Sequence, residues 1–302
     1  MLGRRNFLAI CGFQAAQIAC GNALAEKRAF TFGYSTYAMK NFDPTDAIRE
    51  IRGVGFESLE LCLLPGWPTE PTKLDDNSRK KIREEILKSK LKLTALMEHL
   101  VPTTDSKQAK ALEKRVQLAC KLAVELNPQK PPLLQTVLGG GDFDKLRPLN
   151  EATLKVWADI AGVHKVVLAI KPHRFGAMTL PSQAVSLIES IKSPWLKIVY
   201  DPSHLMFRGF DIYEELKKAK PYLAHVAIKD AFEKDGKVQF DYPGATGKMD
   251  YKSLFEKLNE MGFHGDVNCE ISSMISSKAD YNASKVMKAS FENVTRDLKK
   301  LK

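Results

Sequence analysis

The chain has 302 residues, of which 44% are hydrophobic and 27% are charged, a composition that excludes disordered and fibrous classes. Its 46 Lys and Arg residues outnumber its 36 Asp and Glu residues, which gives a formal net charge of +10. The basic residues are spread along predicted helices rather than gathered in one block, so they indicate solvated helix faces, and we expect no nucleic-acid partner.

The first 25 residues have the pattern of an export signal. Arg4 and Arg5 precede a moderately apolar run, and Ala23 and Ala25 form the small-x-small pattern that signal peptidase cuts. The stretch GRRNFLA resembles the signal of the twin-arginine route, which exports folded proteins. The apolar run is shorter than the roughly 20 residues needed to span a bilayer. We therefore predict cleavage after Ala25, a periplasmic or other extracytoplasmic location, and no stable membrane insertion after cleavage; lipid attachment at Cys20 is the alternative.

Short apolar runs then alternate with amphipathic helical patterns, for which Asp43, Asp105, Pro181 and Asp250 are the expected helix starts. The apolar runs indicate strands because they are short and end in polar residues. Eight strands are predicted in this way, at residues 30–35, 58–63, 92–97, 133–137, 166–170, 197–200, 223–228 and 266–270.

The strand ends recur at intervals of roughly 34 residues, the length of one strand, one helix and their loops. Eight such units without a linker predict a single-domain α/β fold, a (β/α)8 TIM barrel over residues 26–302. An open doubly wound sheet is the alternative, but the first strand lacks the glycine-rich turn of a dinucleotide site. Residues 232–249 depart from the pattern, and Asp235-Gly236 predicts an inserted hairpin that could cover one side of the barrel mouth.

Charged side chains follow the later strands, at the end of the barrel where active sites are found. Lys171 ends the fifth strand, Asp201 the sixth and Glu270 the eighth. Two carboxylates near one ammonium predict either a structural ion network or an acid–base site. Histidines and arginines near the strand ends add candidate ligands or catalysts, and the same residues could instead be hydrogen-bonded or solvated rim residues: His99, His173, Arg174, His204 and Arg208.

The order of the segments GFESLEL, LAIKPH, VYDPSH, LAHVAIKD, YPGATGKMDY and DVNCEIS resembles that of the xylose-isomerase-like sugar phosphate isomerase/epimerase superfamily. The resemblance covers residues 30–302. It implies a barrel that binds Mn²⁺, Mg²⁺ or Co²⁺ through Glu, Asp, His and Glu at the ends of strands five to eight. It also implies that the two glutamates act as an acid–base pair on a keto-sugar.

Two of those four ligand positions are changed in this chain. The first Glu falls on Lys171 and the His falls on Ala227, whereas Asp201, His204 and Glu270 fit the pattern. We therefore expect no cofactor and a divalent-metal site that is weakened or absent, unless His99, His173 or His225 substitutes for a lost ligand. Any metal that does bind is expected at Asp201 and Glu270.

The changed site predicts that the Lys171 ammonium neutralises Asp201 and Glu270 and polarises a sugar carbonyl or hydroxyl. Glu270 is then the general base, and His204 is a substrate ligand or proton carrier. The other expected contacts to a small carbohydrate are His99, His173, Arg174, Asp201, Arg208 and Lys229.

Three functions remain open at this stage. The first is an exported isomerase, epimerase or lyase that abstracts a proton next to the carbonyl of a sugar or keto-glycoside. The second is a lyase or aldolase that forms a Schiff base through Lys171. The third is a noncatalytic carbohydrate-binding relic of the family.

Overall fold

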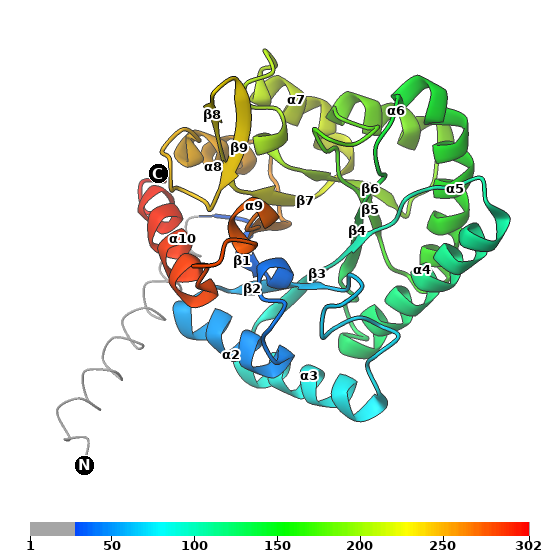
Figure 1. The fold of residues 1–302 in the computed structure, drawn as a ribbon, viewed down its shortest axis with the longest axis horizontal. Coiled ribbons are helices and arrows are strands. Elements are labelled where there is room, and N and C mark those ends of the chain that lie inside the picture. Colours follow the sequence, from blue (N-terminus) through cyan, green and yellow to red (C-terminus); the bar gives the residue numbers. More distant parts are fainter. Residues whose placement is uncertain (1–27, 302) are drawn as a thin grey trace.

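Eight parallel strands form a closed barrel inside a ring of helices (Figure 1). The computed structural model describes residues 28–301, so the predicted export signal at residues 1–25 lies outside the described residues. Around the barrel the strands follow the order β1-β10-β7-β6-β5-β4-β3-β2. Their bounds lie within two residues of the predicted ones: β1 (Thr31–Ser35), β2 (Ser58–Cys62), β3 (Lys92–His99), β4 (Leu133–Val137), β5 (Leu168–Ile170), β6 (Leu196–Tyr200), β7 (Leu223–Ile228) and β10 (Asp266–Cys269). The predicted (β/α)8 fold is confirmed.

The helices begin where the sequence places their caps. The side chains of Asp43, Asp105 and Asp250 each accept a hydrogen bond from a backbone N–H of the first helical turn, which satisfies a donor that the helix itself leaves free. The α-helices are α2 (Pro44–Val54), α3 (Asp76–Ser89), α4 (Ser106–Leu126), α5 (Phe143–Val163), α6 (Pro181–Ile191), α7 (Ile212–Ala219), α8 (Tyr251–Glu260), α9 (Ser273–Ser276) and α10 (Ala283–Leu298). Short 3₁₀ helices are η1 (Thr36–Ala38), η2 (Pro202–His204) and η3 (Lys220–Tyr222). Among residues 28–301, none of the helices has both the length and the apolarity to cross a membrane.

The main core lies between the barrel and the helices, and α10 completes the ring next to α2 and α8 (Figure 1). The Phe291 ring of α10 packs edge-on against Phe56 at a centroid distance of 5.0 Å. Gly55 ends α2 with φ of 117°, a conformation that L side chains rarely adopt, and a Cβ at this position would lie 2.8 Å from the Phe291 ring. This close approach lets α2 and α10 lie side by side.

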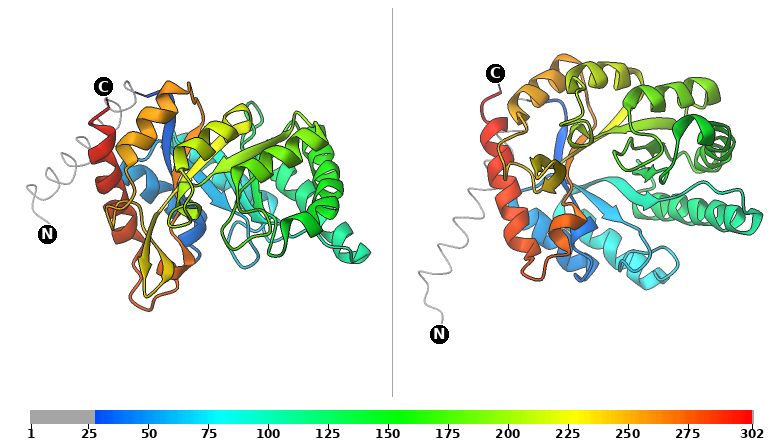
Figure 2. Two further views of the ribbon diagram at one scale, coloured as in Figure 1. Left: turned by 90° about the horizontal axis from the view of Figure 1, so that it is seen from above. Right: turned by 45° about the horizontal axis from the view of Figure 1, so that its top comes forward.

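The predicted insertion is a hairpin of β8 (Asp230–Lys234) and β9 (Lys237–Asp241). Asp235 and Gly236 form its two-residue turn with positive φ at both positions, the geometry that matches the twist of a hairpin. The hairpin projects past the end of the barrel next to α9 (Figure 2). It begins two residues earlier than the sequence suggests, and the expectation that it covers one side of the barrel mouth is confirmed by the position of Phe240, described below.

Candidate active site

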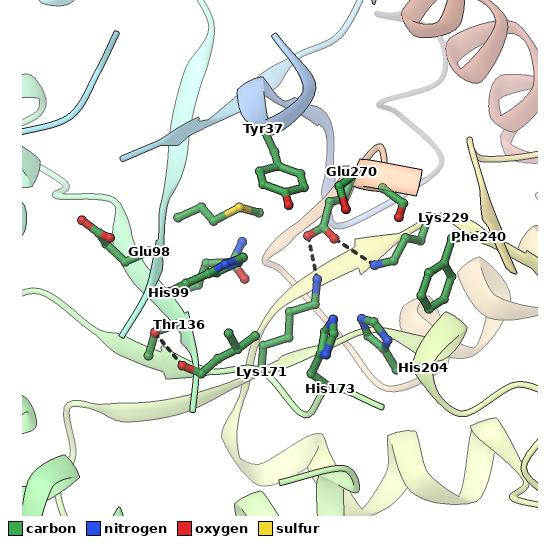
Figure 3. Close-up of a pocket in the computed structure, with 15 residues that line it drawn as sticks. Tyr37, Glu98, His99, Thr136, Lys171, His173, His204, Lys229, Phe240 and Glu270 are labelled. Carbon is green, nitrogen blue, oxygen red and sulfur yellow. Dashed lines mark hydrogen bonds and ion pairs between the residues drawn. The ribbon is translucent and has the colours of Figure 1, made fainter. Parts of the chain in front are cut away.

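Four charged side chains at the C-terminal ends of neighbouring strands form a closed ring of ion pairs. Figure 3 shows three of them, Lys171, Lys229 and Glu270. The Lys171 ammonium lies 2.6 Å from Glu270 Oε2 and 2.9 Å from Asp201 Oδ2. The Lys229 ammonium lies 2.5 Å from the same Asp201 oxygen and 2.8 Å from Glu270 Oε1. Each ammonium therefore bridges both carboxylates, and all four side chains are buried. We call this arrangement the charge ring.

Strand alternation explains why these side chains converge. Each of Lys171, Asp201 and Lys229 directly follows the last residue of its strand. Residues two apart in a strand point to the same side. The residues two positions earlier pack together inside the barrel, in a cluster separate from the main core: Ala169, Val199 and Ala227. The charge ring is therefore the next layer of side chains above this cluster, at the barrel mouth.

Ion pairing in the charge ring holds Glu270, Asp201 and Lys171 in their ionised forms. Burial alone would raise the pKa of Glu270, but the ammonium groups of Lys171 and Lys229 lower it to about 2. Against the same effect of burial, these ammonium groups hold the pKa of Asp201 well below its ordinary value. Burial would lower the pKa of Lys171, yet the two carboxylates raise it above its ordinary value. At neutral pH Asp201, Glu270 and Lys171 are therefore ionised.

Two histidines lie beside the charge ring as neutral imidazoles. The rings of His173 and His204 are 4.0 Å apart between centroids, and His204 Nε2 lies 3.4 Å from Asp201 Oδ2. Burial, reinforced by the Lys229 ammonium, lowers the pKa of both, that of His173 to about 3. Neither ring nitrogen of His204 makes a hydrogen bond to the residues that the structure describes. The buried His204 imidazole therefore has hydrogen-bonding capacity that the described residues leave unused.

Phe240, from strand β9 of the inserted hairpin, covers this corner of the site (Figure 3). Its ring lies 5.3 Å from the Lys229 ammonium and 5.2 Å from the His204 ring, which it meets edge-on. Phe240 itself is 4% exposed. An aromatic cover excludes water from the charges below it and so strengthens their interactions.

A cavity opens beside the charge ring, and we call it the inner pocket. Its lining includes most of the residues that the sequence predicts for the site, namely His99, Lys171, His173, His204, Lys229 and Glu270. Asp201 lies beneath the two ammonium groups. Sequence reasoning missed Tyr37, Phe240, Ser272 and Ser273, which also line the inner pocket. Tyr37 and the two serines come soon after β1 and β10, so the strand-end rule could have found them.

Glu98 also contributes to the lining of the inner pocket, but its carboxylate points away from the charge ring (Figure 3). It lies 2.9 Å from the Arg115 guanidinium of α4. Burial raises the pKa of Glu98 to about 7 in spite of this partner. Because its carboxylate faces α4, we assign Glu98 to the packing of that helix rather than to the chemistry of the pocket.

The two predicted arginine ligands lie outside the lining of the inner pocket. Arg174 donates a hydrogen bond of 3.0 Å to the Met206 carbonyl, and its guanidinium lies 5.9 Å from the Phe240 ring. Arg208 donates to the Thr179 carbonyl at 3.1 Å. Both arginines thus connect the loops after β5 and β6, and their binding of substrate stays a prediction.

The donor set at the barrel mouth does not suit a divalent cation. Asp201 and Glu270 already accept hydrogen bonds from two ammonium groups, and Lys171 adds positive charge where a metal would need a ligand. His225 lies deeper in the barrel, with its nitrogens 3.8 Å from Glu60 and 3.9 Å from Asp266. Within residues 28–301, no group of three or more His, Cys, Asp or Glu side chains is placed to hold a metal ion.

Comparisons with known proteins agree with this architecture. Residues 48–294 match the family described as xylose isomerase-like TIM barrel. A candidate hydroxypyruvate isomerase of Xenopus laevis is 27% identical over 103 residues, which is 34% of this chain and 34% of the relative. Its counterpart in Drosophila melanogaster is 23% identical over 153 residues, 49% of this chain and 56% of the relative. The chain thus matches only about a third to a half of the length of these relatives.

Solved structures extend the likeness to nearly the whole fold. The 3-keto-D-glucoside 4-epimerase of E. coli superposes with a TM-score of 0.72 at 16% identity, over 88% of this chain and 99% of the other. A D-psicose 3-epimerase of Clostridium cellulolyticum H10, solved with D-tagatose, superposes with a TM-score of 0.69 at 15% identity, over 89% of this chain and 97% of the other. At these identities the likeness shows the fold, and the family match covers more than half of the chain. The protein therefore belongs to the xylose isomerase-like TIM barrel family, whose solved neighbours include sugar epimerases.

Proposed function

We propose that the protein isomerises or epimerises a sugar or keto-glycoside by moving a proton at a carbon next to a carbonyl, with two lysine ammonium groups in the place of a metal. The charge ring at the inner pocket carries this proposal, because it combines a carboxylate base with fixed positive charge. The names of the relatives support it, since they describe enzymes that act on keto compounds.

The proposed step begins when the substrate carbonyl oxygen accepts hydrogen bonds from Lys171 and Lys229. Glu270 takes the proton from the neighbouring carbon, and the electron pair of that C–H bond moves toward the carbonyl oxygen to form an enediolate. The two ammonium groups stabilise the new negative charge. Return of a proton to the opposite face of the same carbon gives an epimer. Its return to the former carbonyl carbon gives an isomer, once the hydroxyl proton of the neighbouring carbon has passed to the former carbonyl oxygen. His204 stands beside Asp201 as the second proton carrier.

Glu270 is a weak base while both ammonium groups bind it, because its pKa is held near 2. A carbonyl oxygen that takes hydrogen bonds from Lys171 and Lys229 competes directly with Glu270 for these donors. Substrate binding therefore strengthens the base at the moment when it is needed. This coupling requires both lysines, since each one binds a different oxygen of Glu270.

The charge ring argues against the Schiff-base alternative. Imine formation needs a neutral amine, whereas Asp201 and Glu270 raise the pKa of Lys171 against the opposing effect of burial. The ion pairs also occupy the Lys171 ammonium on two sides. Measured turnover distinguishes an enzyme from a noncatalytic sugar-binding protein.

We expect the wild-type protein to exchange hydrogen for solvent deuterium at the carbon next to the carbonyl of a keto-sugar or keto-glycoside. Glu270→Gln should lower the exchange rate by about 10²–10⁴-fold, because general-base catalysis contributes factors of that size. Glu292→Gln, on the exposed face of α10, should exchange like the wild type. NMR spectra of the sugars in D₂O measure the rates. Sugars that bind without any exchange or turnover would show a binding relic and overturn the proposal.

A metal-independent mechanism predicts that the purified protein carries less than one tightly bound divalent ion per chain. Elemental analysis of protein from metal-replete medium measures this content, and treatment with a chelator should leave activity unchanged. A stoichiometric ion that is lost in Asp201→Asn would contradict the prediction and restore a metal as the electrophile.

We also propose that the protein works outside the cytoplasm, which would make a free sugar or glycoside a more suitable substrate than a phosphorylated metabolite. The support is the Arg4-Arg5 pair, the apolar run and the cleavage pattern that ends at Ala25. N-terminal sequencing of protein from an export-competent host should give Glu26 as the first residue. Cytoplasmic protein that retains Met1 would remove this part of the proposal.

A further inference from the structure

A second cavity adjoins the inner pocket, and we call it the outer pocket. The two share Tyr37 and Ser273 in their walls. The outer pocket lies between the segment after β1 and the segment around α9, and its volume is about 340 Å³ against about 70 Å³ for the inner pocket. Because the inner pocket is so small, the part of a substrate that does not react must extend beyond it, and the shared wall leads to the outer pocket.

The aromatic wall of the outer pocket is rigid. The rings of Tyr37 and Trp67 are parallel to within 5° at a centroid distance of 5.6 Å. The Trp67 indole N–H donates a hydrogen bond of 2.9 Å to the Tyr37 carbonyl, which fixes the indole relative to the segment after β1. Lys40 places its ammonium 4.7 Å from the centre of the indole. This wall therefore needs little ordering when a ligand arrives.

Polar groups share the rest of the lining with the apolar side chains of Ala38, Met39, Phe42 and Ala283. Asn41, Ser276 and Ser277 contribute short polar side chains, and Lys40 contributes the one charged group among the described residues that line this pocket. Aromatic rings accept the apolar C–H face of a sugar ring, while short polar groups bind its hydroxyls. A single lysine without an arginine is a weak basis for binding phosphate. The lining thus favours an uncharged sugar ring.

We propose that the outer pocket is the subsite for a second sugar ring, so that the substrate is a disaccharide or a similar glycoside. Its oxidised ring reaches Lys171 and Glu270 in the inner pocket, and its second ring packs against the wall of Tyr37 and Trp67. This inference rests on the proposed function, because it names the substrate class of the same site.

Two matched sugars test the subsite by isothermal titration calorimetry. One is methyl 3-keto-β-D-glucoside, and the other is cellobiose oxidised to the ketone at C3 of its non-reducing ring, which replaces the methyl group by a second glucose. The disaccharide should bind at least about 10-fold more tightly, since the second ring adds aromatic contact and hydrogen bonds. Its binding should also change the fluorescence emission of the wild type but not that of Trp67→Phe. Of the two other tryptophans, Trp157 is buried in the core, and Trp195 precedes β6, at the opposite end of the barrel from the pockets.

Ser277→Trp places a bulky side chain in the outer pocket from an exposed position, so the fold should persist. In this variant the disaccharide should no longer bind about 10-fold more tightly than the methyl glycoside, and the affinity for the methyl glycoside should be unchanged. Lys40→Ala should reduce the same difference in affinity by a smaller factor, and Ser106→Trp, at an exposed position on α4, is the control for the added indole.

Equal affinities of the wild type for the two sugars would overturn the subsite. So would a Ser277→Trp variant that weakens the methyl glycoside as much as the disaccharide. In both cases exchange of deuterium into the methyl glycoside would still support the proposed function. Absence of binding and of exchange with both sugars would instead overturn the proposed function, and the subsite with it.

Discussion

Replacement of Lys171 by methionine is expected to lower the free energy of unfolding by about 3–5 kcal/mol, the usual cost of removing one partner from a buried ion pair. Lys171 is 4% exposed and bridges Asp201 and Glu270. Without its ammonium the two carboxylates share only Lys229, and the charge ring carries one uncompensated negative charge. Chemical denaturation at pH 7 measures the change.

A double variant separates this charge effect from a loss of packing. Lys171→Met combined with Glu270→Gln removes one charge of each sign and leaves the Asp201–Lys229 pair intact. It should therefore be more stable than Lys171→Met alone. Lys155→Met, at an exposed position on α5, should change stability by less than about 0.5 kcal/mol. If the double variant is no more stable than Lys171→Met, the loss of stability comes from the poor fit of the methionine side chain and not from the uncompensated charge.

The difference in the free energy of unfolding between wild type and Lys171→Met should become smaller at acidic pH. The pKa of Glu270 is depressed from 4.5 to about 2, because Lys171 and Lys229 outweigh the effect of burial. A carboxylate with a depressed pKa contributes stability that is present above the unfolded-state pKa and is lost as the pH falls toward the native one. The difference between wild type and Lys171→Met should therefore be constant near neutral pH and narrow below about pH 4.5.

The fold could be predicted in detail because its signals are local. Short apolar runs and capping aspartates such as Asp43 and Asp105 fix strands and helices within a few residues of sequence. The place of Lys229 in the charge ring follows from the same logic, although we predicted Lys229 only as a contact to the carbohydrate. Side chains two residues apart in a strand point to the same side. Because the sequence places Ala227 on the inner side of the strand, it also predicts that the Lys229 side chain points inward.

Contacts between loops could not be predicted, because they depend on paths that no short pattern specifies. The Asp235-Gly236 turn predicts a hairpin but not that Phe240 lies on His204. Arg174 and Arg208 follow strand ends in the sequence and were predicted to contact the substrate. In the structure both donate hydrogen bonds to carbonyl groups of neighbouring loops. The outer pocket is formed by segments that follow β1 and β10, which are distant in sequence and adjacent in the closed barrel.

A large effect on activity is also expected from Lys171→Arg, which keeps the positive charge and changes its shape. The space between Asp201 and Glu270 fits a compact ammonium with oxygens at 2.9 and 2.6 Å, whereas a guanidinium is planar and wider. The deuterium-exchange rate should fall by about 10²–10³-fold, the cost of losing one donor to a developing oxyanion. Sugar binding should persist, and Lys155→Arg should exchange like the wild type.

Borohydride reduction in the presence of the keto-sugar completes this test, because it traps an imine if one forms. The charge ring predicts no adduct on wild-type protein, since both carboxylates keep Lys171 protonated. A covalent adduct on Lys171 that is absent from Lys171→Arg would show that the amine attacks the carbonyl, and the Schiff-base mechanism would then replace the electrostatic one. Full exchange activity in Lys171→Arg would contradict both mechanisms, because arginine supplies neither a compact charge nor a neutral amine.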